Sequence, residues 1–384
     1  MTAPEPTPSP AVRAARARSL PTPGSRRATV IGAGSFGSAL AVLLAGGGVR
    51  VTLLARTLEQ AKRLAREREN REYLPGVQLP SQVRVEPASG GIERSDYVFL
   101  AVPSRELPEV IPMLQGPELP RRCAVVSLAK GLVPPAGLPP TRVLGEIFGP
   151  DRVACVGGPA HAREMVREGA ALVAASSDEG LARTLALLFT RAGVVCEQSD
   201  DPLGVELAGA AKNAAALAAG ATEAQGLNAA GAAAGHIFAE VWHYARRLGA
   251  RPESMIGLAG TGDLVATALA RESRNRRAGE LLAAGVAAAE IPVRVGQAVE
   301  ALESVPLLAR AIEAAGVEAP VTGALGRLIA GELPLDAWVA LVRATVPPPA
   351  RWRRARPGLW LRAWRALSPA RRAGGRKPGR EGIS

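Results

Sequence analysis

The chain is poor in aromatic residues and in cysteine, and it has no long apolar run free of charge. Aromatic side chains make up 3% of its 384 residues, so its core must be built mainly from alanine, leucine and valine. Its three cysteines, Cys123, Cys155 and Cys196, form neither a CxxC pair nor a Cys/His metal spacing, so we expect no metal site and a reducing compartment. Without a secretory signal or a membrane span, we expect a cytoplasmic protein.

Positive charge is concentrated at the two ends of the chain. The net charge is +12. Residues 346–384 contain eleven Lys and Arg against one Glu, and residues 1–28 contain five Arg against one Glu. These segments carry +10 and +4, which leaves −2 for the remaining residues. The central part therefore lacks the basic surface typical of nucleic-acid binding, and we expect no specific nucleic-acid partner.

Short apolar runs alternate with helical or turn segments in the first half of the chain, which predicts a parallel sheet covered on both faces. After about Gly204 strand-like runs give way to Ala/Leu-rich helical stretches, which continue to about Ala344. We predict an α/β Rossmann-like N-terminal domain followed by an all-α domain. The four predicted parts are a disordered Pro/Arg-rich lead at 1–27, the Rossmann-like domain at 28–201, the helical domain at 202–345 and a disordered basic tail rich in Trp and Arg at 346–384.

The segment VIGAGSFG places Gly32, Gly34 and Gly37 in a GxGxxG pattern directly after a predicted strand and at the start of a predicted helix. The first glycine permits a tight turn, the second lets the backbone approach a pyrophosphate, and the third allows close helix–strand packing. The helix N-terminus then offers amides and a partial positive charge to the phosphates. The pattern predicts a dinucleotide site.

The second predicted strand, VTLLAR, ends in Arg56. An NAD-selective site usually has an acidic residue there, which binds the ribose diol, whereas a cation accommodates the 2′-phosphate of NADP. Arg56 therefore favours NADPH over NADH. The alternative is an ordinary surface arginine.

The run GAAKNAAALAAG at 209–220 contains one cation, Lys212, beside Asn213, and is otherwise alanine, leucine and glycine. A lysine on a helix surface could extend its stem to water. Alternatively, an ammonium in a dry cleft has its pKa lowered by desolvation and can transfer a proton.

Separated segments from Thr29 to about Arg343 resemble, in order, the bacterial-type NAD(P)-dependent sn-glycerol-3-phosphate dehydrogenases. The resemblance implies reversible reduction of dihydroxyacetone phosphate to sn-glycerol 3-phosphate, which supplies glycerophospholipid synthesis. It also implies a helical domain like the C-terminal domain of 6-phosphogluconate dehydrogenase, and a homodimer. The matching segments are VIGAGSFGSAL, NREYLPGVQLP, VFLAVPS, LAKGL, GGPAHAREM, GVELAGAAKN, GLAGTGDLVAT and ESRNRRAGE.

The resemblance also assigns roles. Lys212 is the implied general acid/base and Lys130 bridges substrate and nicotinamide, while Asp263 orients Lys212 or a substrate hydroxyl. The other residues implied to bind substrate are Gly158, Ser273, Arg274 and Asn275. The residues implied to bind cofactor are Gly32, Gly34, Ser35, Phe36, Gly37, Arg56, Lys130, Ala162, Arg274 and Glu300.

The chain departs from the family pattern at three places. The family motif GPTFA reads GPAHA at 158–162, so Ala160 replaces a threonine and His161 is a possible compensating donor. The family motif TKG has Ala129 as its first residue here, and the loop after the lysine helix is shortened, with His236 near the place of an arginine. A hydrogen bond lost to a charged substrate costs roughly 1.5–3 kcal/mol. Two alternatives stay open: a dehydrogenase for another small phosphorylated or carboxylated ketone, and a catalytically weakened dinucleotide-binding protein.

Three of the five tryptophans lie among the arginines of the tail. Trp360, Trp364 and Leu367 have i, i+4, i+7 spacing, so a short helix there would present an apolar stripe beside Arg362 and Arg365. Such a helix could lie on an anionic membrane surface. Salt-dependent binding of nucleic acid and a solvated tail without function are the alternatives.

Overall fold

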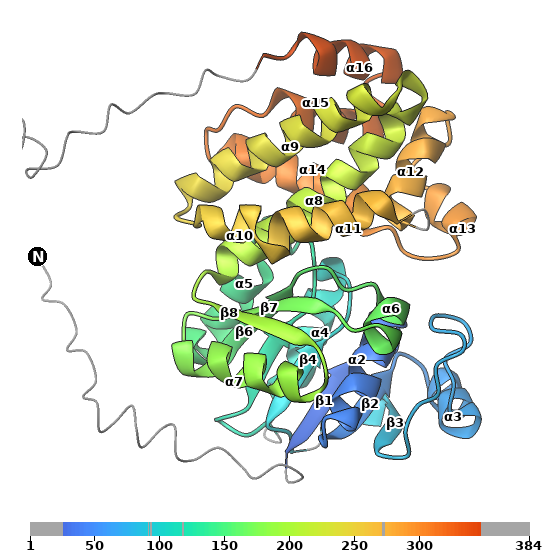
Figure 1. Cartoon of the computed structure of the whole chain (residues 1–384), viewed down its shortest axis with the longest axis vertical. Helices are drawn as coiled ribbons and strands as arrows, with labels where there is room; N and C mark the ends of the chain where they lie inside the picture. The colour runs from blue at the N-terminus through green and yellow to red at the C-terminus, as the bar shows by residue number, and fades with distance from the viewer. Residues whose placement is uncertain (1–25, 91, 93, 117–118, 271–272, 347–384) are drawn as a thin grey trace, which may run out of the picture. The chain divides into compact units, whose positions relative to one another are not determined.

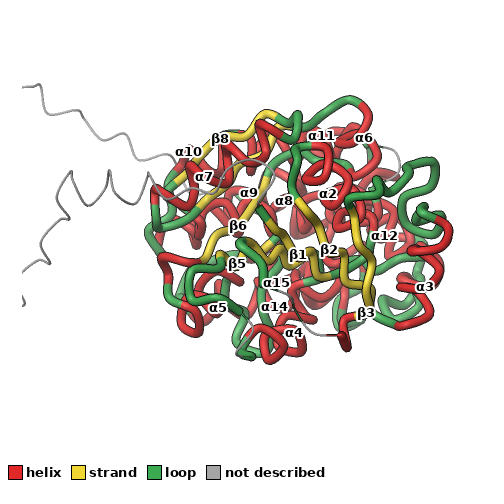
Figure 2. The backbone as a smooth tube through the Cα atoms, turned by 90° about the horizontal axis from the view of Figure 1, so that it is seen from below, coloured by secondary structure: helices red, strands yellow, loops and turns green. Residues whose placement is uncertain are grey.

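The computed structural model describes residues 26–90, 92, 94–116, 119–270 and 273–346. The predictions for the tail, and nearly all of the predicted lead, lie outside these residues. The described strands form one eight-stranded sheet of order β3-β2-β1-β4-β5-β6-β7-β8. Figure 2 shows β3 and β8 towards opposite ends of the sheet. The strands are β1 Arg27–Ile31, β2 Arg50–Ala55, β3 Val83–Pro87, β4 Tyr97–Leu100, β5 Ala124–Ser127, β6 Val153–Gly157, β7 Ala171–Ala175 and β8 Val195–Ser199.

All neighbouring strands pair in parallel except β6 and β7, which run antiparallel. The Rossmann-like sheet predicted from the sequence is therefore confirmed, with one reversed connection that the apolar pattern did not reveal. The edge strands β3 and β8 had not been identified because their polar residues do not form an apolar run. Their sequences, VRVEP and VCEQS, suit strands that are only partly covered.

Alternate residues of the central strands point to two separate apolar layers. Val30 and Phe99 pack on one face, whereas Ile31, Val98 and Leu100 pack on the other, as the two-residue period of a strand requires. The first face is covered by α2 Ser35–Gly46, α3 Leu58–Glu67, α6 Ala162–Arg167 and α7 Glu179–Arg191. The second face is covered by α4 Leu107–Leu114 and α5 Pro140–Phe148.

The second half of the described chain is helical (Figure 1). Its core includes the fully buried Trp338, whose indole Nε1 donates to the carbonyl of Val321 at 3.2 Å. The helices are α8 Pro202–Thr222, α9 Leu227–Arg247, α10 Pro252–Ile256, α11 Asp263–Leu269, α12 Arg274–Ala283, α13 Ile291–Val295, α14 Glu300–Ala314, α15 Pro320–Ile329 and α16 Leu335–Ala344, with the π-helical turn η5 Leu258–Gly262 before α11.

Helix α8 connects the two halves of the fold. It begins at Pro202 after the cap Asp201, whose side chain accepts from the amide of Gly204, and nearly all of its residues are buried. Its apolar side chains share one core with Cys155, Val173 and Ala175 of the sheet. The alanine-rich run containing Lys212 therefore belongs to the core that the helices share with the sheet. The predicted domain limits themselves stay a prediction.

Among the described residues, no helix combines the length and apolarity needed to cross a bilayer. In the same residues, no three side chains of His, Cys, Asp or Glu come together as a metal-ligand group.

Candidate active site

A buried carboxylate lies between two lysines. Asp263, the first residue of α11, accepts from Lys130 Nζ at 2.5 Å through Oδ2, and its Oδ1 lies 3.5 Å from Lys212 Nζ. Asp263 is 3% exposed and Lys212 is 10% exposed at their side chains, so this contact is not a surface ion pair. The interpretation of Lys212 as a surface lysine is wrong because its side chain is buried, and its role in proton transfer stays a prediction.

The neighbours of Lys212 change its proton affinity. Burial and, next, the positive charge of Lys130 lower its pKa to about 8, although the carboxylates of Asp263 and Glu300 partly oppose the shift. For Asp263, burial acts to raise the pKa, but Lys130 and Lys212 outweigh it and hold the pKa below its ordinary value. The cluster therefore contains a firmly ionised carboxylate and a lysine that can exchange a proton near neutral pH.

Lys130 reaches the cluster from the carboxyl end of β5. Its Nζ also donates to the carbonyl of Gly158 at 3.1 Å, in the loop after β6. A Cβ at Gly209 would lie 3.4 Å from the Lys130 side chain, an ordinary contact distance, so Lys130 packs beside α8. The carboxyl ends of parallel strands are where doubly wound folds bind their ligands.

Asn213, next to Lys212, is a further site residue that had not been included among the predicted ones. Its Nδ2 donates to the carbonyl of Lys130 at 3.0 Å and lies 3.4 Å from Glu300 Oε2. Its Oδ1 accepts from Asn275 Nδ2 at 2.8 Å. A polar amide beside a lysine in an otherwise apolar run was the available signal, because a buried amide needs partners.

Close packing of α8 and α12 places Ser273, Arg274 and Asn275 beside the cluster. A Cβ at Gly279 would collide with the carbonyl of Leu217, so only glycine allows the two backbones to lie this close. The Ser273 hydroxyl accepts from the amide of Arg276 at 3.4 Å and caps α12, while Arg274 donates to the carbonyl of Ala298 at 3.3 Å. The three residues predicted to bind the substrate phosphate thus lie together at the start of one helix.

The glycine turn fits a dinucleotide. Gly32 has φ +108°, and a Cβ at Gly37 would collide with the carbonyl of Gly32, whereas a Cβ at Gly34 would meet no atom within 4 Å. Helix α2 begins after Gly34 without a side-chain cap and without an acidic residue in its first turn. Open space beside the backbone and uncapped amides at a helix N-terminus suit a pyrophosphate.

Asn70 stabilises this turn through side-chain hydrogen bonds, although it had not been predicted as a site residue. Its Nδ2 donates to the carbonyl of Ala33 at 2.9 Å and to Ser38 Oγ at 2.8 Å, and Asn70 is 1% exposed. It lies in the segment NREYLPG, far from the glycines in sequence. Family resemblance marked the segment but gave no role for the asparagine.

The remaining predicted cofactor residues lie at the starts of helices or directly after a strand. Ser35 and Phe36 begin α2, and Phe36 packs against the same core layer as Ala162, the first residue of α6. Arg56 is exposed immediately after β2. Glu300 begins α14, where its Oε1 lies 3.4 Å from the amide of Ser104.

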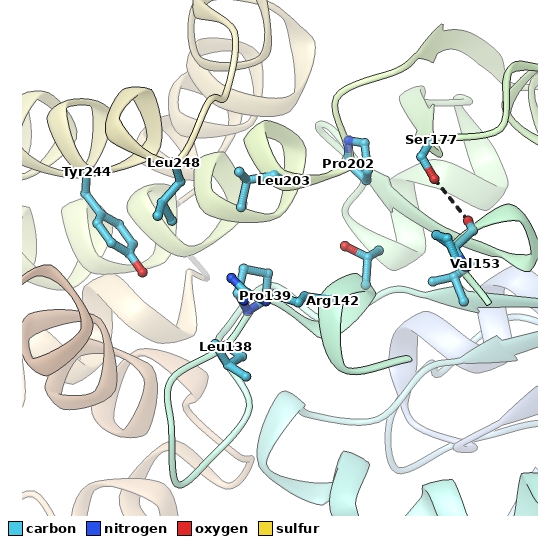
Figure 3. Close-up of a pocket in the computed structure, with 11 residues that line it drawn as sticks. Leu138, Pro139, Arg142, Val153, Ser177, Pro202, Leu203, Tyr244 and Leu248 are labelled. Atoms are coloured by element: carbon cyan, nitrogen blue, oxygen red, sulfur yellow. Dashed lines mark hydrogen bonds between the residues drawn. The ribbon is translucent and has the colours of Figure 1, made fainter. Parts of the chain in front are cut away.

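A cavity of about 300 Å³ lies elsewhere, between α5 and the helices α8 and α9 (Figure 3). Tyr244, Leu248 and Leu203 line one side of it, and Pro139 and Arg142 line the other. None of the predicted site residues lines this cavity. The titratable cluster around Asp263, rather than this largely apolar hollow, is therefore the candidate active site.

Comparison with known proteins agrees with this geometry. The family profile of the NAD-dependent glycerol-3-phosphate dehydrogenase N-terminus matches residues 27–182, and that of the C-terminus matches residues 201–340. A glycerol-3-phosphate dehydrogenase (NAD(P)+) of Deinococcus radiodurans is 41% identical over 307 residues, which are 79% of this chain and 90% of that protein. One of Frankia casuarinae is 38% identical over 320 residues, 80% of this chain and 94% of that protein.

A solved structure also matches. The crystal structure of glycerol-3-phosphate dehydrogenase from Coxiella burnetii superposes with a TM-score of 0.77 at 28% identity, covering 84% of this chain and all of that one. The chain therefore belongs to the family of NAD-dependent glycerol-3-phosphate dehydrogenases.

Proposed function

We propose that the chain catalyses the reversible NAD(P)H-dependent reduction of dihydroxyacetone phosphate to sn-glycerol 3-phosphate, for glycerophospholipid synthesis. The observation that carries this is the contact of one buried carboxylate, Asp263, with Lys130 and Lys212. Family membership supplies the substrate, and the cluster supplies the acid/base group and positive charge that reduction of a ketone needs.

A nicotinamide cofactor held at the glycine turn of Gly32, Gly34 and Gly37 would supply the hydride for the carbonyl carbon. Lys212 in its ammonium form polarises the carbonyl oxygen and donates a proton to the alkoxide that forms. In the reverse direction the neutral amine accepts the hydroxyl proton. Asp263 keeps the two lysines near this oxygen, and Lys130, held by the Gly158 carbonyl, adds a second positive charge.

The phosphate of the substrate binds at the start of α12 in this proposal. The helix N-terminus, the Arg274 guanidinium and the Asn275 amide offer donors to a dianion. The Ser273 hydroxyl, which caps the helix, orients these groups. Asn275 also bonds Asn213, so phosphate binding and the position of Lys212 are linked through one amide pair.

Arg56 makes NADPH the preferred cofactor in this proposal, because its exposed guanidinium follows β2 where the adenosine 2′-phosphate binds in Rossmann folds. Arg56→Asp should raise the KM for NADPH at least about tenfold and lower that for NADH. Arg50→Asp, at the opposite exposed end of the same strand, is the control. Unchanged KM values for both cofactors in Arg56→Asp would remove the assignment.

The finer cellular features are proposals as well. Three cysteines without a disulfide suit the reducing cytoplasm. Family membership favours a homodimer, which light scattering after gel filtration would detect.

The basic composition of residues 346–384 favours peripheral contact with anionic membranes. Co-sedimentation with anionic liposomes should be lost when the chain ends at Thr345, and equal sedimentation of both forms would exclude the contact.

A second candidate is reduction of another small phosphorylated or carboxylated ketone. Ala129 and Ala160 favour it, because both replace hydroxyl-bearing residues of the family pattern. A panel of such ketones would separate the two candidates. The non-catalytic alternative predicts cofactor binding without turnover of any substrate.

The deciding experiment follows NADPH oxidation with dihydroxyacetone phosphate. Wild type should turn over and Lys212→Ala should lose at least about a hundredfold in kcat, the usual contribution of a positioned general acid. Lys62→Ala, a substitution of an exposed lysine on α3, is the matched control and should behave as wild type. Wild type that binds NADPH without oxidising it would contradict the proposal.

A further inference from the structure

His161 lies in the loop between β6 and α6, directly before the first residue of α6. It does not cap that helix with its side chain. Its Nε2 atom is buried and has no hydrogen-bond partner among the described residues. Burying a polar nitrogen without a partner costs free energy, so such an atom is uncommon in a folded protein and points to a group that is supplied from outside.

The loop of His161 is part of the wall of the active site. Gly158, three residues earlier, accepts from Lys130 Nζ through its carbonyl. Pro159 Cδ would lie 3.8 Å from a Cβ at Gly262, the residue before Asp263. His161 also lies close enough to Asp263 to help lower the pKa of that carboxyl. The loop therefore packs against the segment that holds the carboxylate of the cluster.

The cluster divides into two chemically different ends. Arg274 and Asn275 at the start of α12 offer donors for a phosphate, whereas His161 lies on the side of Gly158 and Asp263. Ala160, beside His161, has only a methyl group and packs against the apolar core of the sheet. On this short stretch the imidazole is the side chain that can bind a polar substrate group.

We propose that His161 determines substrate specificity by forming a hydrogen bond through Nε2 with the primary hydroxyl of the three-carbon ketone, at the end opposite the phosphate. This inference rests on the proposed function. The substrate hydroxyl supplies the missing partner of the nitrogen, and the nitrogen satisfies a hydroxyl that would otherwise be buried alone.

The test compares two substrates that differ by this hydroxyl alone, dihydroxyacetone phosphate and hydroxyacetone phosphate, whose terminal carbon is a methyl group. In wild type, loss of the hydroxyl should lower kcat/KM roughly 5- to 100-fold. In His161→Phe, the values for the two substrates should converge, because only dihydroxyacetone phosphate loses a partner. His161→Gln, whose amide nitrogen reaches a similar position, should retain most of the discrimination.

Where hydroxyacetone phosphate is reduced too slowly, its competitive inhibition constant replaces kcat/KM in the comparison. Fluorescence titration with NADPH should give the same Kd for all three proteins, which shows that the loop has kept its structure. Equal losses for both substrates in His161→Phe, or full discrimination retained, would overturn the inference. Wild type that reduces neither substrate would instead contradict the proposed function.

Discussion

Lys130 and Lys212 share one carboxylate but differ in their exposure and in their distance from it. Lys130 is 19% exposed at its side chain and donates to both Asp263 and a backbone carbonyl, whereas Lys212 is less exposed and 3.5 Å from Asp263. Burial accordingly shifts the pKa of Lys212 to about 8. In the proposed reaction, the tighter ion pair of Lys130 would position the substrate, and the looser one would leave the Lys212 ammonium able to react.

The pH dependence of the reaction should report this difference. Reduction needs the protonated Lys212, so kcat/KM for the ketone should fall as pH rises through about 8, and the reverse reaction should rise there. Asp263 raises the pKa of Lys212 and Lys130 lowers it. Asp263→Asn should therefore move the fall in kcat/KM to lower pH, and Lys130→Met should move this fall to higher pH. Shifts of the same sign in both variants would contradict this electrostatic account.

The hydrogen bonds of Asn70 lead to a second prediction for a single residue. Without its amide, the carbonyl of Ala33 loses its closer side-chain donor, so the glycine turn is less well fixed. Asn70→Ala should weaken NADPH binding about tenfold while kcat at saturating cofactor changes little. Gln82→Ala, which removes an exposed amide, should leave the Kd unchanged. A loss in kcat alone would mean that the asparagine does not act through the turn.

At the scale of elements, the contact between α8 and α12 carries the site. Gly220 and Gly279 let the backbones approach, since a Cβ at either would collide with the backbone of the other helix. This approach brings Asn275 to Asn213. A glycine pair on two helices far apart in sequence therefore sets the distance between the predicted phosphate site and the reacting lysine.

Two matched helix substitutions test that contact. Alanine is the better helix former at both positions by up to about 1 kcal/mol. Gly323→Ala on α15 adds a Cβ into open space and should be neutral or stabilising. Gly279→Ala should instead destabilise by about 1–3 kcal/mol, because of overpacking, and should raise the KM for the ketone. Urea denaturation measures the first effect, and equal stabilities of the two variants would show that the helices can separate without cost.

The sequence was sufficient to predict most secondary-structure elements, but it did not predict the side-chain contacts between them. The glycine turn, the Ala-rich helix around Lys212 and most strands were identified because each has a local pattern. The polar edge strands β3 and β8 were not identified, and the reversed direction of β7 was not predicted, because edge position and strand direction depend on the whole sheet. At the site, Lys130 and Asp263 were predicted by resemblance, but the bonds of Asn213 and Asn70 join residues far apart in sequence.

On the scale of the whole molecule, a second buried acid links the sheet to the helices. Glu206 on α8 accepts from the amide of Thr141 at 2.9 Å and from its hydroxyl at 2.6 Å, at the start of α5. Burial raises its pKa to about 8, although the bonds from Thr141 oppose the shift. Glu206 thus lies where α8, the helix that contains Lys212, contacts α5.

Glu206 should make stability depend on pH. Since its folded pKa is about 8, compared with the ordinary value of 4.5, the folded state holds the proton more tightly. Its contribution is complete below about pH 4.5 and is lost as pH rises towards 8, with a slope of at most about 1.4 kcal/mol per pH unit. Glu206→Gln should flatten the free energy of unfolding over this interval, and Glu332→Gln, an exposed control, should not. An unchanged slope in Glu206→Gln would show that the carboxyl stays ionised.

The buried indole of Trp338 gives the molecule an internal optical reporter. Of the five tryptophans, three lie beyond Thr345 and the other two are Trp242 on α9 and Trp338 on α16, so the Rossmann-like half has none. In a chain ending at Thr345, tryptophan fluorescence excited at the red edge of protein absorption comes only from the helical half. Circular dichroism, in contrast, reports on the secondary structure of both halves. Melting curves recorded by the two methods will therefore show directly whether the halves unfold together.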